Sequence, residues 1–412
     1  MAASAVSQHT RRVVVSGVGV VSPIGLGRDA FWSRLCAGGS GVAPMERVPE
    51  SARLPTVAAA VRVFNAKDYI TSVHLRRMDR FSRMIVAAGR MALADAGVAI
   101  ERETPERVGV VVGSALGDTS ESTVFLEKVF SKGPAAASPL VFPNLVLNAA
   151  ASYTSMELGA TGVNFTVAQA ETSGEQAIML ACEMLRAGRA DIVVAGGGDE
   201  LPPILFDIYR STSALSGQRG GGEWSSPYDA ARNGVVLGEG AAMLTLESPE
   251  RAQARGACVY AEIDDDCSFS VPAPLYDWPT AASAALPMLR RLTANGAVDL
   301  ICGSANSSRH LDACELDLFH QLCGDAAGDV FLASLKGAIG EFGAAGALSA
   351  AAACLALREQ RVPPLCHLRQ ADPQARFRFA VPNAVPARLD RALVCGLGRG
   401  GAGVAISFRR ST

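Results

Sequence analysis

Residues 166–185 read TVAQAETSGEQAIMLACEML and contain the transition that decides the fold. Thr166 and Val167 end an apolar strand, ETSG makes a tight turn, and the apolar residues after Gly174 recur with the spacing of an amphipathic helix. A bend of this kind, between a strand and a helix, often carries a catalytic nucleophile at the helix N-terminus. Here the bend carries Glu171, whose carboxylate is an unusual choice for that position.

Similar strands and helices alternate along the chain. Short β-branched runs such as RVGVVVGSA and ADIVVAGGG are separated by Ala-rich helical stretches such as MIVAAGRMALADAGV. This pattern predicts strands buried on both faces in a layered α/β protein. The charged stretch ESPERAQARG closes one series of strands and helices, and a second, similar series follows. We therefore predict two similar halves, residues 11–255 and 256–412, each with a Gly-rich turn before a buried helix.

The composition limits the classes of function. The 412 residues are 49% hydrophobic with a net charge of −2, which argues against partners recruited by bulk charge, such as nucleic acid or an anionic membrane. The ten cysteines lie mostly in apolar runs without metal-ligand spacing, so we predict free buried thiols and no metal site. The first ten residues lack an apolar signal core, and residues 342–357 are too few to span a bilayer. We expect a cytoplasmic protein.

The Gly-rich segments do not predict a nucleotide cofactor. In GVGVVSPIGLG, near the N-terminus, Gly17, Gly19 and Gly25 do not fit the GxGxxG spacing, and Ser22 and Pro23 interrupt the expected start of a helix. The segments 194–200, 340–346 and 396–403 do not follow a Walker pattern. We interpret all of them as turns where backbones approach one another closely.

Five motifs, in this order, resemble the β-ketoacyl synthase family, which has a thiolase-like fold. They are RRVVVSGVGVVSPIG, MDRFSRMIVAAGRMALADAGV, VGVVVGSALG, PYDAARNGVVLGEGAAMLTLE and SLKGAIGEFGAAG. The resemblance runs from Arg11 to Phe408 and points to the branch of fatty-acid elongating enzymes and type II polyketide ketosynthases. It implies a duplicated α/β fold with five αβαβα layers. It also implies substrates presented on the phosphopantetheine arm of an acyl carrier protein, with no other cofactor.

Active members of that family use a Cys at the bend as the nucleophile that accepts the acyl group. Matching ETSG to the family's turn places Glu171 at the position of that Cys. A carboxylate is a much weaker acyl acceptor than a thiolate, and its acyl product would be a reactive mixed anhydride. Interpreted without the family resemblance, Glu171 is an ordinary exposed carboxylate that the helix dipole stabilises. Both interpretations predict that Glu171 does not condense acyl chains.

Active members also use two His residues to support decarboxylation of the malonyl extender. Counting back from the acidic residues at the end of GSANSSRHLDACE places Ser304 at the first His position, or Ala305 or Asn306 if the loop differs in length. Glu341 stands at the second His position, and Lys336 alone is retained. Neither Ser304 nor Glu341 can stabilise a developing enolate as an imidazole does.

The family includes chain length factors, which lack the nucleophile, often carry Gln in its place and pair with a catalytic ketosynthase. The resemblance implies such a subunit in a type II polyketide or aryl polyene-type system, with a ketosynthase and an acyl carrier protein as partners. Arg399 stands at the gating Phe position, which implies a pocket that no longer accepts acyl groups. Thr119, Ser122 and Leu126 share one face of the helix after VGSALG and are predicted to line a shared, relatively open tunnel.

Three alternatives stay open from the sequence. The chain could be a malonyl-carrier decarboxylase that starts synthesis, although such enzymes retain the His residues. It could be an active condensing enzyme that uses Glu171, or a noncatalytic homodimer. Residues 138–167 resemble the family's dimerisation region, so each alternative predicts a dimer.

Overall fold

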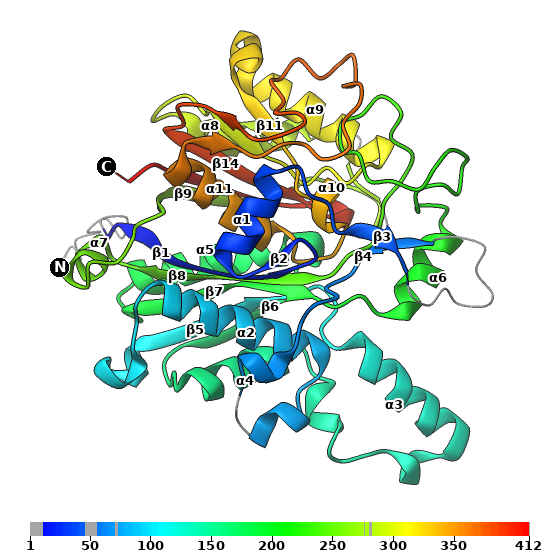
Figure 1. The fold of residues 1–412 in the computed structure, drawn as a ribbon, viewed down its shortest axis with the longest axis vertical. Coiled ribbons are helices and arrows are strands. Elements are labelled where there is room, and N and C mark those ends of the chain that lie inside the picture. The colour runs from blue at the N-terminus through cyan, green and yellow to red at the C-terminus, as the bar shows by residue number, and fades with distance from the viewer. Residues whose placement is uncertain (1–10, 46–55, 71–72, 276, 280–281, 412) are drawn as a thin grey trace, which may run out of the picture.

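Two half-sheets with the same strand order form the framework of the protein (Figure 1). The computed structural model describes residues 11–45, 56–70, 73–275, 277–279 and 282–411. The N-terminal half-sheet has the order β1 (Val13–Ser22), β8 (Gly240–Glu247), β7 (Ile192–Asp199), β5 (Val108–Gly113), β6 (Asn164–Val167). The C-terminal half-sheet has the order β9 (Ala261–Ser270), β15 (Ala402–Arg409), β14 (Arg391–Leu397), β10 (Leu300–Cys302), β11 (Phe331–Ala333).

The duplication extends to the direction of every strand in the two half-sheets. In each, the first two pairings are antiparallel and the next two are parallel. Antiparallel pairing of β1 with β9 joins the half-sheets, and α7 (Pro249–Ala254) lies on the segment between the two series. The duplicated α/β fold predicted from the sequence is therefore confirmed, whereas the boundary at residues 255 and 256 stays a prediction.

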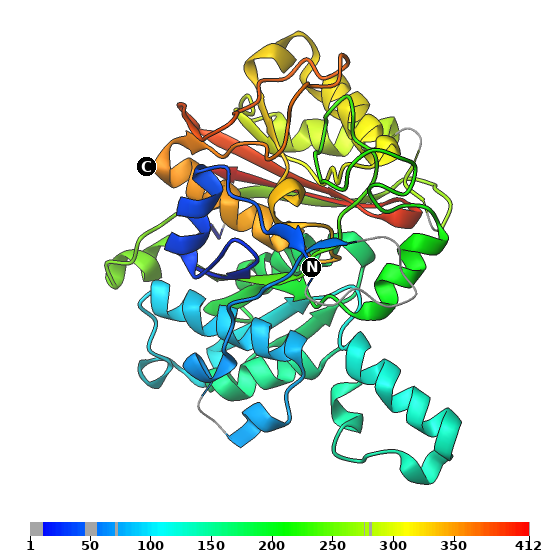
Figure 2. The same ribbon diagram turned by 45° about the vertical axis from the view of Figure 1, so that its right-hand side comes forward.

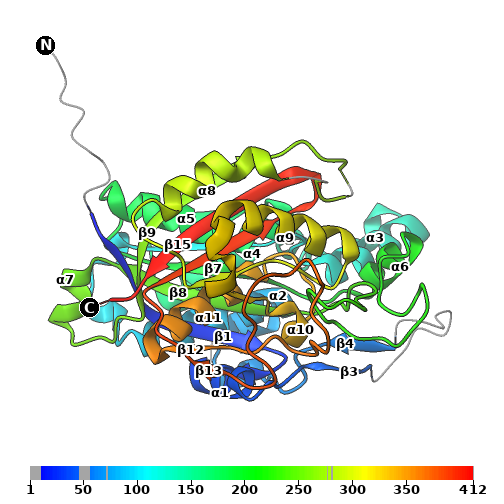
Figure 3. The ribbon, with the colours of Figure 1, turned by 90° about the horizontal axis from the view of Figure 1, so that it is seen from above.

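Three pairs of helices make five layers with the two half-sheets (Figures 1 and 3). Helices α2 (Arg80–Asp95) and α4 (Ala149–Leu158) cover the outer face of one half, and α8 (Leu286–Thr293) and α9 (Arg309–Cys323) cover the other. Between the half-sheets lie α5 (Ser173–Arg186) and α11 (Gly346–Glu359). The Ala-rich α11 is buried along most of its length, as a helix that is apolar all round must be.

A glycine sets how closely the central helices approach. A Cβ atom on Gly174 would lie 2.8 Å from both the carbonyl oxygen of Ala344 and the amide nitrogen of Ala347. Only glycine leaves room for this backbone contact. The start of α5, which follows the bend at Glu171, is therefore fixed against the start of α11.

Helix α3 (Thr119–Lys132) projects from the body of the protein (Figure 2), and none of its residues is buried. Large apolar side chains are exposed on α3 and in the segment that follows it; they are Val124, Leu126, Phe130, Leu140 and Phe142. Strand β6 ends the described sheet and pairs there with β5 alone. Exposed apolar side chains and an unpaired sheet edge are each typical of a protein interface.

The remaining elements are short and connect these layers. The helices are α1 (Arg28–Cys36), α6 (Pro203–Ser211) and α10 (Lys336–Ile339), and the strands are β2 (Gly25–Leu26), β3 (Val42–Pro44), β4 (Val57–Ala59), β12 (Arg361–Val362) and β13 (Val385–Pro386). No helix in the described part of the chain is long and apolar enough to cross a membrane. The ten cysteines are free and most are buried, as predicted. Residues 1–10, on which the expectation of no signal segment rests, lie outside the described residues.

Candidate functional site

The bend before α5 holds Glu171 in a strained turn. Ala170 has a φ of 47°, in the left-handed region, which costs a non-glycine residue on the order of 1 kcal/mol. The hydroxyl of Ser173 stabilises the turn: it accepts a hydrogen bond from the Gln169 amide at 2.8 Å and donates one to the Ala170 carbonyl at 2.7 Å. The turn therefore places the Glu171 carboxylate at the N-terminus of α5, where the sequence predicted an elbow.

Glu171 forms a buried ion pair with Arg399. The Arg399 amide donates to Glu171 Oε2 at 3.0 Å, and the guanidinium Nη1 pairs with Oε1. Glu171 is only 8% exposed, so the expectation of an ordinary exposed carboxylate is wrong. The reason is Arg399, whose charge lies over the bend and compensates the loss of solvent around the carboxylate.

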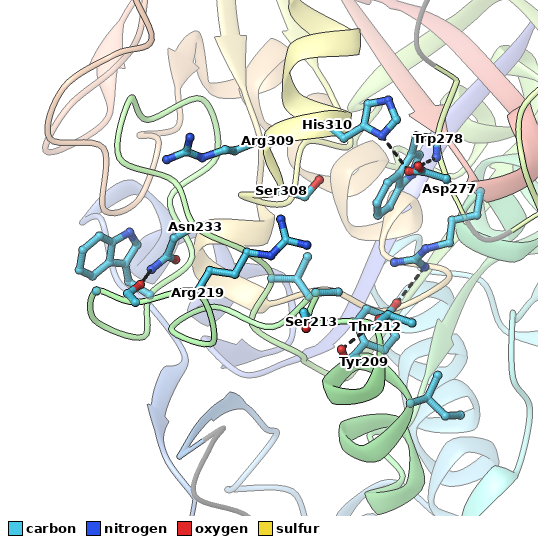
Figure 4. Close-up of a pocket in the computed structure, with 18 of the residues that line it drawn as sticks. Tyr209, Thr212, Ser213, Arg219, Asn233, Asp277, Trp278, Ser308, Arg309 and His310 are labelled. Atoms are coloured by element: carbon cyan, nitrogen blue, oxygen red, sulfur yellow. Dashed lines mark hydrogen bonds and ion pairs between the residues drawn. The ribbon is translucent and has the colours of Figure 1, made fainter.

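Tyr209 and Trp278, both labelled in Figure 4, hold the Arg399 side chain in place. Its Nη1 donates to the Tyr209 hydroxyl at 2.9 Å. Its guanidinium carbon lies 4.9 Å from the centre of the Tyr209 ring and 4.3 Å from that of Trp278, within cation–π range. Burial disfavours the charged guanidinium, but attraction to the neighbouring acidic groups outweighs it, and the pKa of Arg399 is raised. Arg399 therefore stays charged.

An inner cavity beneath this ion pair brings together three of the predicted site residues. Glu171, Ser304 and Lys336 line it, whereas Ala305 and Asn306 do not. Its volume is about 10 Å³, which is room for about one water molecule and not for an acyl chain. That these positions correspond to the family's catalytic residues stays a prediction.

Ser304 is held by hydrogen bonds on every side. Its hydroxyl donates to Glu315 Oε1 at 2.6 Å and accepts from the Leu397 amide at 3.0 Å, and its own amide donates to the same Oε1 at 2.7 Å. Glu315 Oε2 accepts from the Tyr228 hydroxyl at 2.8 Å. Burial raises the pKa of Glu315. The Ser304 hydroxyl thus connects the chain just after β10 to the end of β14. A reacting group would have to displace Glu315 or the Leu397 amide to reach this hydroxyl.

The retained lysine is neutralised locally. Lys336 Nζ lies 2.9 Å from Glu341 Oε2, and both side chains are more than nine-tenths buried. The salt bridge compensates the charges of both groups, so Lys336 has no unpaired positive charge to stabilise a developing enolate. The thiols of Cys302 and Cys395 also line the inner cavity, but burial raises the pKa of both, so they are thiols and not thiolates.

Glu175 is a part of this site that the sequence analysis missed. It is 2% exposed, and its carboxylate packs so tightly against α11 that a Cβ atom on Gly346 would lie 1.8 Å from the carboxyl carbon. Burial raises the pKa of Glu175 to about 7, although attraction to Lys336 opposes the shift. Its sequence signal was a Glu one helical turn after Glu171 in a largely apolar helix.

The predicted tunnel residues lie away from the inner cavity, on α3. The Thr119 hydroxyl donates to the Leu116 carbonyl at 3.0 Å, the Ser122 hydroxyl donates to the Asp118 carbonyl at 2.6 Å, and Leu126 is 49% exposed. These residues share the projecting surface described above, so their role in a tunnel stays a prediction.

His310 does not reach the inner cavity. It lies in the first turn of α9, where its Nδ1 is 2.8 Å from Asp277 Oδ1, and it lines a separate outer chamber. Arg399 lies between the two spaces, since it lines the outer chamber and contacts Glu171, which lines the inner cavity. The lining of the inner cavity thus contains no imidazole among the described residues.

Comparisons with known proteins agree with this fold. Residues 10–252 match the model of the β-ketoacyl synthase N-terminal domain, and residues 260–369 match that of the C-terminal domain. The 3-oxoacyl-[acyl-carrier-protein] synthase 2 of Rhizobium meliloti (strain 1021) is 33% identical, with 98% of this chain and 99% of the relative covered. That of Synechocystis sp. (strain ATCC 27184 / PCC 6803 / Kazusa) is 30% identical, with 97% and 98% covered.

Solved structures add a second kind of relative. One described as the ishigamide ketosynthase/chain length factor has a TM-score of 0.90 and 27% identity, and covers 98% of this chain and 100% of its own. A type II polyketide acyl-carrier protein in complex with its ketosynthase has a TM-score of 0.88 and 26% identity, with 97% and 100% covered. The matched domains and the relatives, together with the repeated sheet, show that this chain belongs to the β-ketoacyl synthase family.

Proposed function

We propose that this chain is a noncatalytic, chain-length-factor-type subunit that pairs with an active ketosynthase. In the pair it shapes the tunnel into which a carrier-bound polyketide or polyene chain grows. The observation that carries the proposal is the buried ion pair between Glu171 and Arg399 at the bend. The pair lies at the bend where the resemblance expects the nucleophile, and Glu171 lines an inner cavity of about 10 Å³.

Similarity to solved complexes supports the choice of partners. The neighbours include a ketosynthase/chain length factor and a ketosynthase bound to its acyl-carrier protein. The curated relatives are synthases by name, so similarity alone does not separate a catalytic subunit from a noncatalytic one. The groups at the bend support the noncatalytic role, because a paired carboxylate is a poor acyl acceptor.

The same groups disfavour the two catalytic alternatives. A malonyl decarboxylase needs donors that stabilise an enolate, but the Ser304 hydroxyl is engaged with Glu315, and the Lys336 ammonium is paired with Glu341. A condensing enzyme that used Glu171 would first have to break the ion pair with Arg399.

Reconstitution with a ketosynthase tests the proposal. The chain is co-expressed with a β-ketoacyl synthase that has the intact Cys and both His residues, and the product is examined by native mass spectrometry. Malonyl-carrier condensation is then measured for each subunit alone and for the pair. We expect a one-to-one heterodimer, with elongation by the pair. A homodimer of this chain that releases CO2 from malonyl carrier by itself would overturn the proposal.

A further inference from the structure

Helix α3 projects from the body of the protein, and its N-terminal end, residues 118–121, forms a root that orients it (Figure 2). None of the residues of α3 is buried. Phe125 packs against Phe142, in the segment that returns to the body, with ring centres 6.3 Å apart. The projection therefore has contacts of its own, and a change at the root can reorient it as a unit.

Carboxylates bind the backbone amides of the root. Asp118 caps α3, and its Oδ1 accepts a hydrogen bond from the Glu121 amide at 2.9 Å. Glu200, the residue that follows β7, accepts one from the Ser120 amide at 2.8 Å. Carboxylates are favourable partners for the positive end of a helix dipole, so both hydrogen bonds hold α3 against the body.

Four carboxylates crowd together at this root. Asp79, which caps α2, lies with Glu121 and Glu200 close enough to Asp118 to disfavour its ionisation. Asp79, Asp118 and Glu200 are each more than nine-tenths buried. The Oδ2 atom of Asp118 is also buried and accepts no hydrogen bond from the described residues. A buried anionic oxygen without a partner is costly, and a proton removes that cost.

The other groups near the cluster do not neutralise it. No Lys or Arg of the described residues forms an ion pair with any of the four carboxylates. Arg80 lies near Glu200, but its guanidinium is paired with Glu239, with Nε 2.9 Å from Oε2. The Tyr153 hydroxyl faces the cluster but donates to Asn144 Oδ1 at 2.9 Å. Repulsion between the carboxylates is therefore relieved by protonation and not by a cation of the described chain.

We propose that the root of α3 is a proton-controlled hinge. With a proton on Asp118 the root stays closed against α2 and the end of β7. When Asp118 loses the proton, its charge is repelled by the neighbouring carboxylates, and the root loosens together with the apolar surface that α3 carries. The hinge goes beyond the proposed function and does not require pairing with a ketosynthase.

The direction of the pH dependence follows from the position of Asp118. Burial raises its pKa to about 7, and the neighbouring carboxylates add to the shift, although the hydrogen bond from the Glu121 amide opposes it. An Asp in the opened, solvated root has the ordinary pKa of about 3.9. The closed root is therefore most stable below that value, and it loses stability as the pH rises to about 7.

Hydrogen exchange of the full chain, followed by mass spectrometry at pH 6 and pH 8, tests this inference. Rates are corrected for the intrinsic effect of pH, and the buried helix α11 is the internal reference. We expect the α3 amides to exchange about 10-fold faster at pH 8, the ratio that a closed-root pKa of about 7 and an open-root pKa of about 3.9 give. Asp118→Asn should remove most of this difference, because Asn caps a helix as Asp does but cannot ionise.

Asp207→Asn is the matched control, since the Asp207 side chain is 61% exposed and pairs with Arg210 on α6, outside the root. This variant should keep the difference between the two pH values. The inference is overturned if α3 exchanges equally fast at both pH values relative to α11, or if Asp118→Asn keeps the whole difference. The comparison of the unchanged chain at two pH values needs no variant, so it decides the question even if Asp118→Asn does not fold. The chain is measured without a ketosynthase, so this result is separate from the test of the proposed function.

Discussion

Removing the guanidinium of Arg399 should destabilise the protein mainly through the carboxylate that is left behind. Arg399→Met keeps the length of the apolar stem, but Glu171, whose side chain is 8% exposed, retains only a backbone donor from residue 399. Breaking a fully buried pair costs about 3–5 kcal/mol. The Arg399 side chain is one-fifth exposed, so solvent from the outer chamber should reduce the cost to about 2–3 kcal/mol.

A double-mutant cycle isolates the interaction free energy between Glu171 and Arg399. Glu171→Gln alone should cost about 1 kcal/mol, since the amide still accepts the backbone hydrogen bond. The double variant should then be more stable than the sum of the single changes predicts, by about 2 kcal/mol. Thermal unfolding of the four proteins under matched conditions measures this coupling, at about 1 °C per kcal/mol for a chain of this length. Effects that add within about 0.5 kcal/mol would refute the ion pair as the reason for Glu171.

Three further outcomes follow from the described contacts. Glu175→Gln should raise the thermal midpoint at pH 8 by about 2–4 °C but change it little at pH 4. The reason is that the pKa of Glu175 is about 7 in the folded protein, above its value of 4.5 in the unfolded chain. The unchanged protein therefore loses stability as the pH rises from the unfolded pKa to the folded one, and the Gln variant does not. An equal shift at both pH values would show that Glu175 does not titrate as argued. Thr119→Phe should shorten the products of the reconstituted pair, whereas Lys128→Phe, on the opposite face of α3, should leave their length unchanged. Products of unchanged length in the Thr119 variant would remove that residue from the tunnel. Gly174→Ala should destabilise the chain by about 1–3 kcal/mol, because its Cβ would meet the backbone at Ala344 and Ala347, and a neutral effect in thermal unfolding would contradict this packing.

Most of the fold could be predicted, because strands and helices form in the structure where the hydrophobic periodicity of the sequence predicts them. Both series of strands appear where the β-branched runs lie, and the Ala-rich segment forms the buried helix α11. The antiparallel pairing of β1 with β9, which joins the half-sheets, was not predictable. It depends on backbone contacts between residues about 250 apart in the chain, and periodicity within a segment carries no information about them.

The sequence predicted that some of these residues lie together, but not the interactions between them. The motifs placed Glu171, Ser304 and Lys336 in one region, and the structure brings these three around one cavity. The pairing of Glu171 with Arg399 was missed, because an exposed and a buried carboxylate look alike in a sequence. Glu175 was missed for a related reason: a Glu in the first turn of a helix usually faces solvent and caps the dipole. Its burial follows from Gly346 and Gly396, which leave room for the carboxylate.

The most direct test of the central claim is chain elongation by the reconstituted pair with Glu171→Ala in this subunit. Native mass spectrometry confirms the heterodimer in the same sample, and a pair that lacks the ketosynthase partner's nucleophilic Cys is the control without condensation. We predict that the Glu171→Ala pair elongates malonyl units at about the rate of the unchanged pair. Loss of elongation with the heterodimer intact would contradict the account and make Glu171 a catalytic residue.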